Sequence, residues 1–173
     1  WTEPKPLPAP INTKKNDGAA TFSGDGQTMV YGGCNREDGI GGCDLYISTL
    51  NGTEWSEPVN MGNVVNSPEW DAQPALSADG SMLIFTSERK GGYGNEDLYM
   101  VTRNVFGEWG IPSNLGTVIN TPDKEVSPFL GADSKTLYFC STGHPGFGGA
   151  DIFVTTFENG KWTEPRNMGA PLN

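Results

Sequence analysis

The sequence predicts an all-β protein, a β-propeller or an arc of one, built from four-stranded antiparallel blades. The first observation is a repeat: similar units open with WTEP, WSEP, WGIP and WTEP at positions 1, 55, 109 and 162. A period of 53 or 54 residues is close to that of one propeller blade. The second observation is that every unit carries short β-branched or aromatic runs between Gly and Asn turns, without helical periodicity.

The repeats predict one propeller segment over residues 1–173. We divide it into full repeats 1–54, 55–108 and 109–161 and a partial repeat 162–173, with 1–8 as an extra outer strand. Propellers close with four to eight blades. We therefore expect that the remaining blades of a longer chain, or other subunits, are needed to close the ring.

Each repeat contains the same series of strands. The first strand is predicted at 19–23, 74–77 and 128–131, and the Asp-Gly or Asp-Ser turn that follows is a hairpin signal. A second strand, a Gly-rich loop, a third strand and a Trp-led fourth strand come next. In such a meander the Asp-Gly and Asn-Gly turns lie on one side of the disc. The Gly-rich loops and the long links between repeats share the other side, where loops carry function on a rigid scaffold.

The charge balance excludes several classes of partner. The chain has 11 Lys plus Arg against 21 Asp plus Glu, a net charge of -10. Nucleic acids and anionic membranes need a basic surface, so neither is an expected partner. No apolar run approaches the roughly 18 residues of a membrane helix. No signal peptide is recognised, which predicts a mature form or an excised piece.

The three cysteines differ in their expected roles. Cys34 and Cys43 stand at the two ends of the first Gly-rich loop only, and a disulfide between them would place the chain in an oxidising compartment. The alternative is two unrelated free thiols. Cys140 lies in the apolar run TLYFCS and is expected to be a small buried side chain.

The repeated motifs resemble those of Pro-Asp-type, TolB-like propellers, which are also WD-repeat-like. The shared pattern reads W-x-E-P-x-N-x-G, then P-x-L-S-x-D-G, then G-G-x-G-x-x-D-L-Y, and it recurs along the whole chain. Ala20, Gly131 and Ser134 depart from it. The resemblance implies a periplasmic protein associated with the outer membrane or peptidoglycan, of the kind often fused to an OmpA-type domain. One similar group is the PorE-like components of the type IX secretion apparatus.

Two sets of aspartates recur, and both are expected to be structural. They are Asp25, Asp79 and Asp133 at the turns, and Asp44, Asp97 and Asp151 after the Gly-rich loops. Because an active site is asymmetric, carboxylates that recur once per blade are better explained as acceptors for backbone N–H groups. A calcium site using Glu37, Asp38 and Asp44 is the alternative. His144 is the only histidine and has no evident catalytic partner.

The candidate binding residues are the non-repeating ones. Arg89, Lys90, Tyr93, His144 and Phe147 lie in the Gly-rich loops, and we predict that they contact a partner. The alternative is a solvated loop. The recurring tryptophans at positions 1, 55, 109 and 162 are expected to pack between blades rather than stack on sugars.

These observations predict a non-enzymatic periplasmic scaffold that mediates protein–protein interaction in a cell-envelope or secretion assembly, with no cofactor and no bound metal. The alternative is a carbohydrate-active or calcium-stabilised carbohydrate-binding propeller. Such an enzyme would use two non-repeating carboxylates, Glu69 and Glu96, about 5 to 9.5 Å apart in one pocket.

Overall fold

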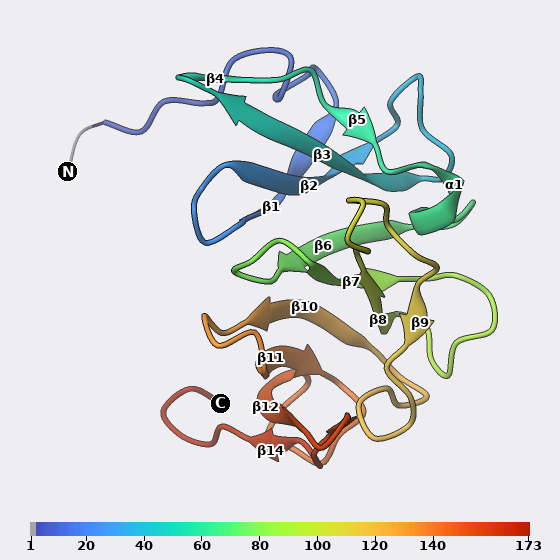
Figure 1. The fold of residues 1–173 in the computed structure, drawn as a ribbon. Helices are drawn as coiled ribbons and strands as arrows, with labels where there is room; N and C mark the ends of the chain where they lie inside the picture. The colour runs from blue at the N-terminus through green and yellow to red at the C-terminus, as the bar shows by residue number, and fades with distance from the viewer. Residues whose placement is uncertain (1–2) are drawn as a thin grey trace.

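The structure, a computed structural model, describes residues 3–173 as three antiparallel β-sheets that follow one another along the chain (Figure 1). Each sheet is one blade. Blade 1 contains β1 (Asn16–Phe22), β2 (Thr28–Cys34), β3 (Cys43–Asn51), β4 (Glu54–Trp55) and β5 (Val59–Asn60). Blade 2 contains β6 (Asp71–Leu76), β7 (Met82–Ser87), β8 (Asp97–Thr102) and β9 (Ser113–Asn114). Blade 3 contains β10 (Glu125–Leu130), β11 (Thr136–Ser141), β12 (Asp151–Glu158), β13 (Lys161–Trp162) and β14 (Arg166–Asn167). β4 and β5 lie one after the other along β3, as β13 and β14 do along β12, so each pair forms one interrupted fourth strand and the predicted fold class is confirmed.

The first strand of each blade begins three residues earlier than predicted, because a β-bulge interrupts it. The register with the second strand shifts between Gly18 and Thr21, and at the equivalent positions of the other blades. Ala19, Gln73 and Ser127 occupy these bulges with φ of 50°, 52° and 53°. A bulge adds a residue that breaks the period-two pattern, and for this reason the apolar alternation revealed only the second half of each strand.

The predicted extra outer strand at 1–8 is absent from its described part. Residues 3–8 form no strand, and residues 1–2 lie outside the described chain. A strand needs a neighbour for its backbone groups, and this segment has no third strand beside it. At the other end, β13 and β14 both pair with β12, so residues of the partial repeat 162–173 complete blade 3.

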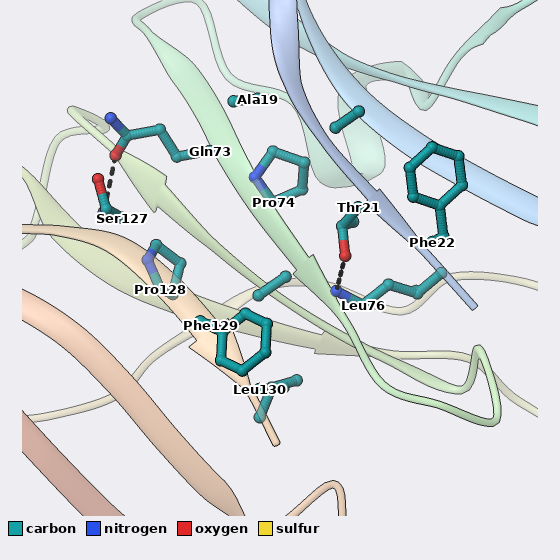
Figure 2. A pocket seen from close by; sticks show the side chains of 12 residues that line it. Ala19, Thr21, Phe22, Gln73, Pro74, Leu76, Ser127, Pro128, Phe129 and Leu130 are labelled. Atoms are coloured by element: carbon teal, nitrogen blue, oxygen red, sulfur yellow. Dashed lines mark hydrogen bonds between the residues drawn. The ribbon is translucent and has the colours of Figure 1, made fainter. Parts of the chain in front are cut away.

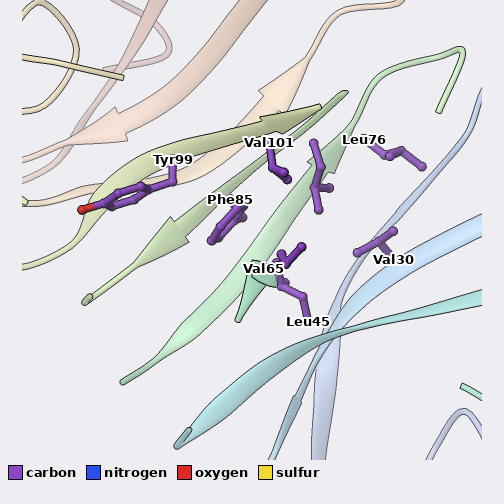
Figure 3. Close-up of a cluster of buried hydrophobic side chains, with 8 residues drawn as sticks. Val30, Leu45, Val65, Leu76, Phe85, Tyr99 and Val101 are labelled. Atoms are coloured by element: carbon purple, nitrogen blue, oxygen red, sulfur yellow. The ribbon is translucent and has the colours of Figure 1, made fainter. Parts of the chain in front are cut away.

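The two junctions between blades hold the main hydrophobic cores. Figure 3 shows the first, where Val30 and Leu45 of blade 1 face Leu76, Phe85 and Tyr99 of blade 2. Ile84 and Leu98 of blade 2 contact Leu137, Phe139 and Phe153 of blade 3 in the same way. Trp109 and Trp162 pack at the borders of these two cores, whereas Trp55 packs on blade 1 against Phe22. Trp1 lies outside the described residues.

An asparagine side chain fastens each link to the blade that it leaves, and it is buried in blades 1 and 2. Asn66 Oδ1 accepts the Leu45 N–H at 2.9 Å, and its Nδ2 donates to the Leu45 carbonyl at 3.1 Å. Asn120 bonds both backbone groups of Leu98, and Asn173 bonds those of Ile152. We call this arrangement the asparagine clamp. A single helical turn, α1 (Gly62–Val65), leads into the clamp of blade 1.

The predicted division of the disc into two sides is confirmed. The Gly-rich loop of blade 1 bonds the link into blade 2 through Gly42 N and the Glu69 carbonyl, at 3.0 Å. Asn95 N and the Asp123 carbonyl make the same contact one blade further on. We call this side, formed by residues 35–42, 67–70, 88–96, 121–124 and 142–150, the Gly-rich-loop face.

Candidate functional site

A buried aspartate closes each Gly-rich loop. The Asp44 carboxylate accepts the N–H groups of Ile40 and Gly41 at 2.7 and 3.1 Å, and the side-chain amide of Asn60 at 3.4 Å. Asp97 and Asp151 accept the corresponding groups in blades 2 and 3. The structural interpretation of this aspartate set is therefore confirmed, because their carboxylates are occupied by their own loops.

In blades 1 and 2 the Gly-rich loops are so tightly packed that glycine is required on both sides of one residue. A Cβ on Gly92 would lie 2.1 Å from Asp97 Oδ2, and one on Gly94 would lie 2.2 Å from the Asp123 carbonyl oxygen. Gly39 and Gly41 are similarly confined by Asp44 and by the Glu69 carbonyl. In blade 3 the restriction holds on one side only, because Gly146 is confined by Asp151 whereas a Cβ on Gly148 would meet nothing closer than 3.9 Å.

That middle residue is large and apolar in every blade, and it is exposed. Ile40, Tyr93 and Phe147 are 39%, 53% and 76% exposed, and each donates its N–H to the buried aspartate of its own loop. The interpretation of Tyr93 and Phe147 as non-repeating is thus wrong, since they occupy one repeated position. We call these three side chains the apolar row. Packing explains buried repeated residues, but it does not explain repeated apolar residues that face water.

Arg89 and His144 are also members of a repeated set, and this set is internal. The Arg89 guanidinium lies 5.1 and 4.8 Å from the ring centroids of Phe85 and Tyr99, bonds Asp71 Oδ1 at 2.7 Å and donates to the Val65 carbonyl. Arg36, not singled out from the sequence, repeats this arrangement between Tyr31 and Tyr46, with Asp17 as its carboxylate.

His144 takes the same place in blade 3. Its Nε2 lies 2.8 Å from the Ile119 carbonyl, and its ring contacts Phe139 and Phe153. These contacts make Arg89 and His144 parts of the blades rather than free binding groups. An arginine two residues after the second strand was a visible signal in blades 1 and 2, but in blade 3 the residue at this place is His144, displaced by one position.

Burial and hydrogen bonds shift the pKa values of Tyr46 and Asp17, which surround Arg36 in blade 1. Desolvation, together with the nearby Asp38 carboxylate, raises the pKa of Tyr46 to about 12. Burial opposes ionisation of Asp17, but hydrogen bonds from Thr13 and Arg36 outweigh it and hold the pKa of this carboxyl below its ordinary value. The Arg36–Asp17 pair is therefore charged at neutral pH.

The remaining predicted residues differ in their surroundings. Lys90 is 92% exposed at its side chain and lies 3.6 Å from Glu69. Cys34 and Cys43 are directly opposed on β2 and β3 and are joined by a disulfide. Cys140 is half-buried rather than buried, because it lies on the face of blade 3 that no other blade covers, and this burial raises the pKa of its thiol.

Glu69 and Glu96, the carboxylates considered for glycoside hydrolysis, lie at different blade junctions. Glu69 lies at the junction of blades 1 and 2, whereas Glu96 lies at the next junction, where its Oε1 bonds Lys124 Nζ at 2.8 Å. The shallow groove beside Glu96 is lined by Glu88, Gly94, Asn95 and Lys124 and does not include Glu69. Within residues 3–173, no three His, Cys, Asp or Glu side chains converge as metal ligands.

An open groove of about 520 Å³ runs across the first strands of all three blades. Figure 2 shows its lining, including Pro74, Pro128 and Phe129, and two hydrogen bonds that join neighbouring blades. Thr21 Oγ1 accepts the Leu76 N–H at 3.1 Å, and Gln73 Oε1 accepts the Ser127 N–H at 2.8 Å. Side-chain oxygens on the first strands thus tie adjacent blades, and the groove offers no charged side chain for catalysis among its lining residues.

One exposed apolar feature on the opposite side was not predicted. The turn between β8 and β9 is longer than its counterparts and places Val105 and Phe106 at its tip, 95% and 85% exposed. Its signal was one extra residue and two apolar side chains in NVFGE, where the other repeats have NGTE and ENGK.

The architecture places the chain among β-propellers with four-stranded antiparallel blades, and comparison with solved structures narrows the fold further. No family model and no curated protein matches the chain. TolB from Acinetobacter baumannii is 19% identical with a TM-score of 0.58, over 87% of this chain and 32% of its own. A protein described as TolB from Agrobacterium tumefaciens is 16% identical with a TM-score of 0.57, over 82% of this chain and 46% of its own.

An α-L-arabinofuranosidase from Lactobacillus brevis is 15% identical with a TM-score of 0.58, over 100% of this chain and 62% of its own. The chain thus spans less than two thirds of each of these proteins. At such identities the likeness defines the fold, which is that of a TolB-like β-propeller. No helix within residues 3–173 is long and apolar enough to cross a membrane.

Proposed function

We propose that the chain is a non-enzymatic β-propeller scaffold of the bacterial periplasm that binds another protein through its Gly-rich-loop face. The observation that carries this proposal is the apolar row, which holds one exposed apolar side chain per blade on a loop fixed by a buried aspartate. Rigid loops bind with a smaller loss of conformational entropy than mobile ones. Exposed aromatic side chains are common anchors of protein interfaces.

A periplasmic location is supported by two features. The fold is TolB-like, and the Cys34–Cys43 disulfide suits an oxidising compartment. Within the envelope we propose a role in an assembly at the outer membrane or peptidoglycan, with a type IX-like secretion apparatus as the specific candidate. The motif resemblance supports that assignment.

The proposal is tested by capture from envelope extracts with immobilised protein. We expect a specific envelope protein to be retained by the wild type and lost with Tyr93→Ser/Phe147→Ser. The matched control is Val105→Ser/Phe106→Ser, which removes two exposed apolar side chains from the opposite side and should retain the partner. Equal retention by the row variant and the wild type would refute the proposal.

We also propose that further blades of the same repeat complete the ring. Phe129, Tyr138 and Ile152 occupy on blade 3 the places where Ala75, Ile84 and Leu98 of blade 2 meet the next blade. Phe129 is 64% exposed there. An apolar sheet face of this kind is stabilised when another sheet covers it.

Before β1, Asn12 occupies the position of the clamp asparagine but bonds no strand. Ile11, Asn12 and Thr13 correspond to Val65, Asn66 and Ser67, but the Asn12 side chain is exposed and its amide donates only to Leu7 O. Slower hydrogen exchange of β12 amides in a longer native chain than in residues 1–173 would support additional blades. Equal exchange in the two forms would contradict them.

A further inference from the structure

The cations of the Gly-rich-loop face are neutralised by neighbouring carboxylates. Lys90 pairs with Glu69 at 3.6 Å, and Lys124 pairs with Glu96 at 2.8 Å. Glu96 is also the first cause of the raised pKa of Lys124, through a hydrogen bond. Arg89 is held inside blade 2 by Asp71. None of these groups contributes free positive charge to the face.

Four exposed carboxylates on the same loops and links have no such partner. Among residues 3–173, no Lys, Arg or His nitrogen lies within 4.0 Å of Glu37, Asp38, Glu88 or Asp123. Lys14 and Lys15 take, in the link before β1, the places that Pro68 and Glu69 take in the next link, so they also lie on this side, exposed and with no carboxylate oxygen within 4.0 Å among residues 3–173. Among residues 3–173, four unpaired carboxylates on this side thus outnumber two unpaired lysines, so the surroundings of the apolar row are net negative.

The spacing of the row follows from blade stacking. Packed sheets lie about 10 Å apart, so successive row residues are separated by at least roughly that distance. An extended chain advances about 3.3 Å per residue, and alternate side chains face the same side. A chain laid across the row would thus present an apolar side chain at about every fourth residue.

We propose that Ile40, Tyr93 and Phe147 form a docking surface for an extended, Lys- or Arg-rich segment of a partner protein that carries apolar anchors about four residues apart. This inference rests on the proposed scaffold function and specifies the partner's chemistry. The apolar anchors contact the row, while the cations between them meet Glu37, Asp38, Glu88 and Asp123. A second copy of this chain, with its net charge of -10, and an anionic lipid surface both lack the complementary charge.

The test uses a labelled 16-residue peptide with Leu at every fourth position and Lys and Ser between. Two control peptides replace the Leu residues by Ser, or the Lys residues by Glu. Binding is measured by fluorescence anisotropy, and the site is located from amide chemical shifts of the labelled protein. We expect shifts in residues 35–42, 88–96 and 142–150 and much weaker binding of both control peptides.

Variants separate the apolar and the charge contributions. Tyr93→Ser/Phe147→Ser should weaken the Leu/Lys peptide at least about tenfold. Glu37→Gln/Glu88→Gln should weaken it less and reduce its dependence on salt. Val105→Ser/Phe106→Ser should bind as the wild type does.

Equal binding of the Lys and Glu peptides, or shifts confined to other surfaces, would overturn the inference. If the Leu/Lys peptide does not bind, but wild-type protein captures an envelope partner that Tyr93→Ser/Phe147→Ser does not capture, the scaffold function stands and the proposed cationic chemistry of the partner is wrong. If a neutral oligosaccharide changes the amide chemical shifts of the row residues, and neither the peptide nor any envelope protein binds, both proposals are wrong.

Discussion

The asparagine clamp permits a sharp test, because the sequence supplies an internal control for it. Asn66→Ala removes three hydrogen bonds of 2.9 to 3.1 Å, two to the Leu45 backbone and one to Asn60. The Leu45 carbonyl keeps the Met61 N–H at 3.0 Å, but the buried Leu45 N–H loses its acceptor. An unsatisfied buried group costs about 1–3 kcal/mol, and the other lost bonds add about 0.5–1.5 kcal/mol each.

We expect Asn66→Ala to lower the free energy of unfolding by about 2–4 kcal/mol, which allows for partial relaxation at the site. Asn12→Ala changes the same repeat position, but its side chain is exposed and bonds only the Leu7 carbonyl. This control should stay within about 0.5 kcal/mol of the wild type.

The measurement is urea denaturation followed by fluorescence, with hydrogen exchange at the Leu45 amide. The exchange should accelerate in Asn66→Ala and remain unchanged in Asn12→Ala. The clamp would be refuted if the two variants lost equal stability, or if the Leu45 amide stayed protected without Asn66.

Three further predictions concern the loops and turns. Gly41→Ala should lower the free energy of unfolding by about 1–3 kcal/mol, because its Cβ would lie 2.0 Å from the Glu69 carbonyl oxygen. Gly42→Ala is the control, since its Cβ would meet nothing within 4 Å. Similar urea midpoints for the two variants would contradict the close packing. Reduction of the Cys34–Cys43 disulfide should lower the free energy of unfolding by about 2–3 kcal/mol for a loop of this length, and it should increase hydrogen exchange mainly in residues 35–42. Cys34→Ser/Cys43→Ser is the control. Faster exchange throughout the chain would contradict a local role for the disulfide. The Thr136 hydroxyl and the backbone N–H groups of Lys135 and Thr136 lower the pKa of Asp133 to about 2. Because this folded-state pKa lies below the unfolded value of 3.8, its contribution to stability is present above pH 3.8 and is lost as the pH falls towards 2. Asp133→Asn should remove this part of the pH dependence, and an NMR titration that places the Asp133 pKa at 3.8 or higher would contradict the hydrogen-bond assignment.

Much of the blade could be predicted because its signals are local. Asp-Gly turns, apolar alternation and the 54-residue period identified the second and third strands and the two sides of the disc. The same local logic assigned Asp44, Asp97 and Asp151 to their own loops. The first strands were placed only in part, because the bulges at Ala19, Gln73 and Ser127 shift the pattern by one residue.

The candidate site was less predictable, because exposure depends on neighbours in space. The sequence placed Arg89, Tyr93 and Phe147 in the same loops and could not separate them. The tertiary structure places Arg89 between two aromatic rings beside Asp71 and leaves Tyr93 and Phe147 in water. Beside Tyr93, the missing Cβ of Gly92 leaves room for the Asp97 carboxylate, and that of Gly94 lets the loop contact the next link.

The sequence by itself therefore determined the repeat, the antiparallel blades and the side on which the loops gather, because turn chemistry and side-chain period act over a few residues. Only the tertiary structure decided which repeated residues are buried and which are exposed. Asn12 and Asn66 show the reason: they share one motif, but only Asn66 has the backbone of a third strand beside it.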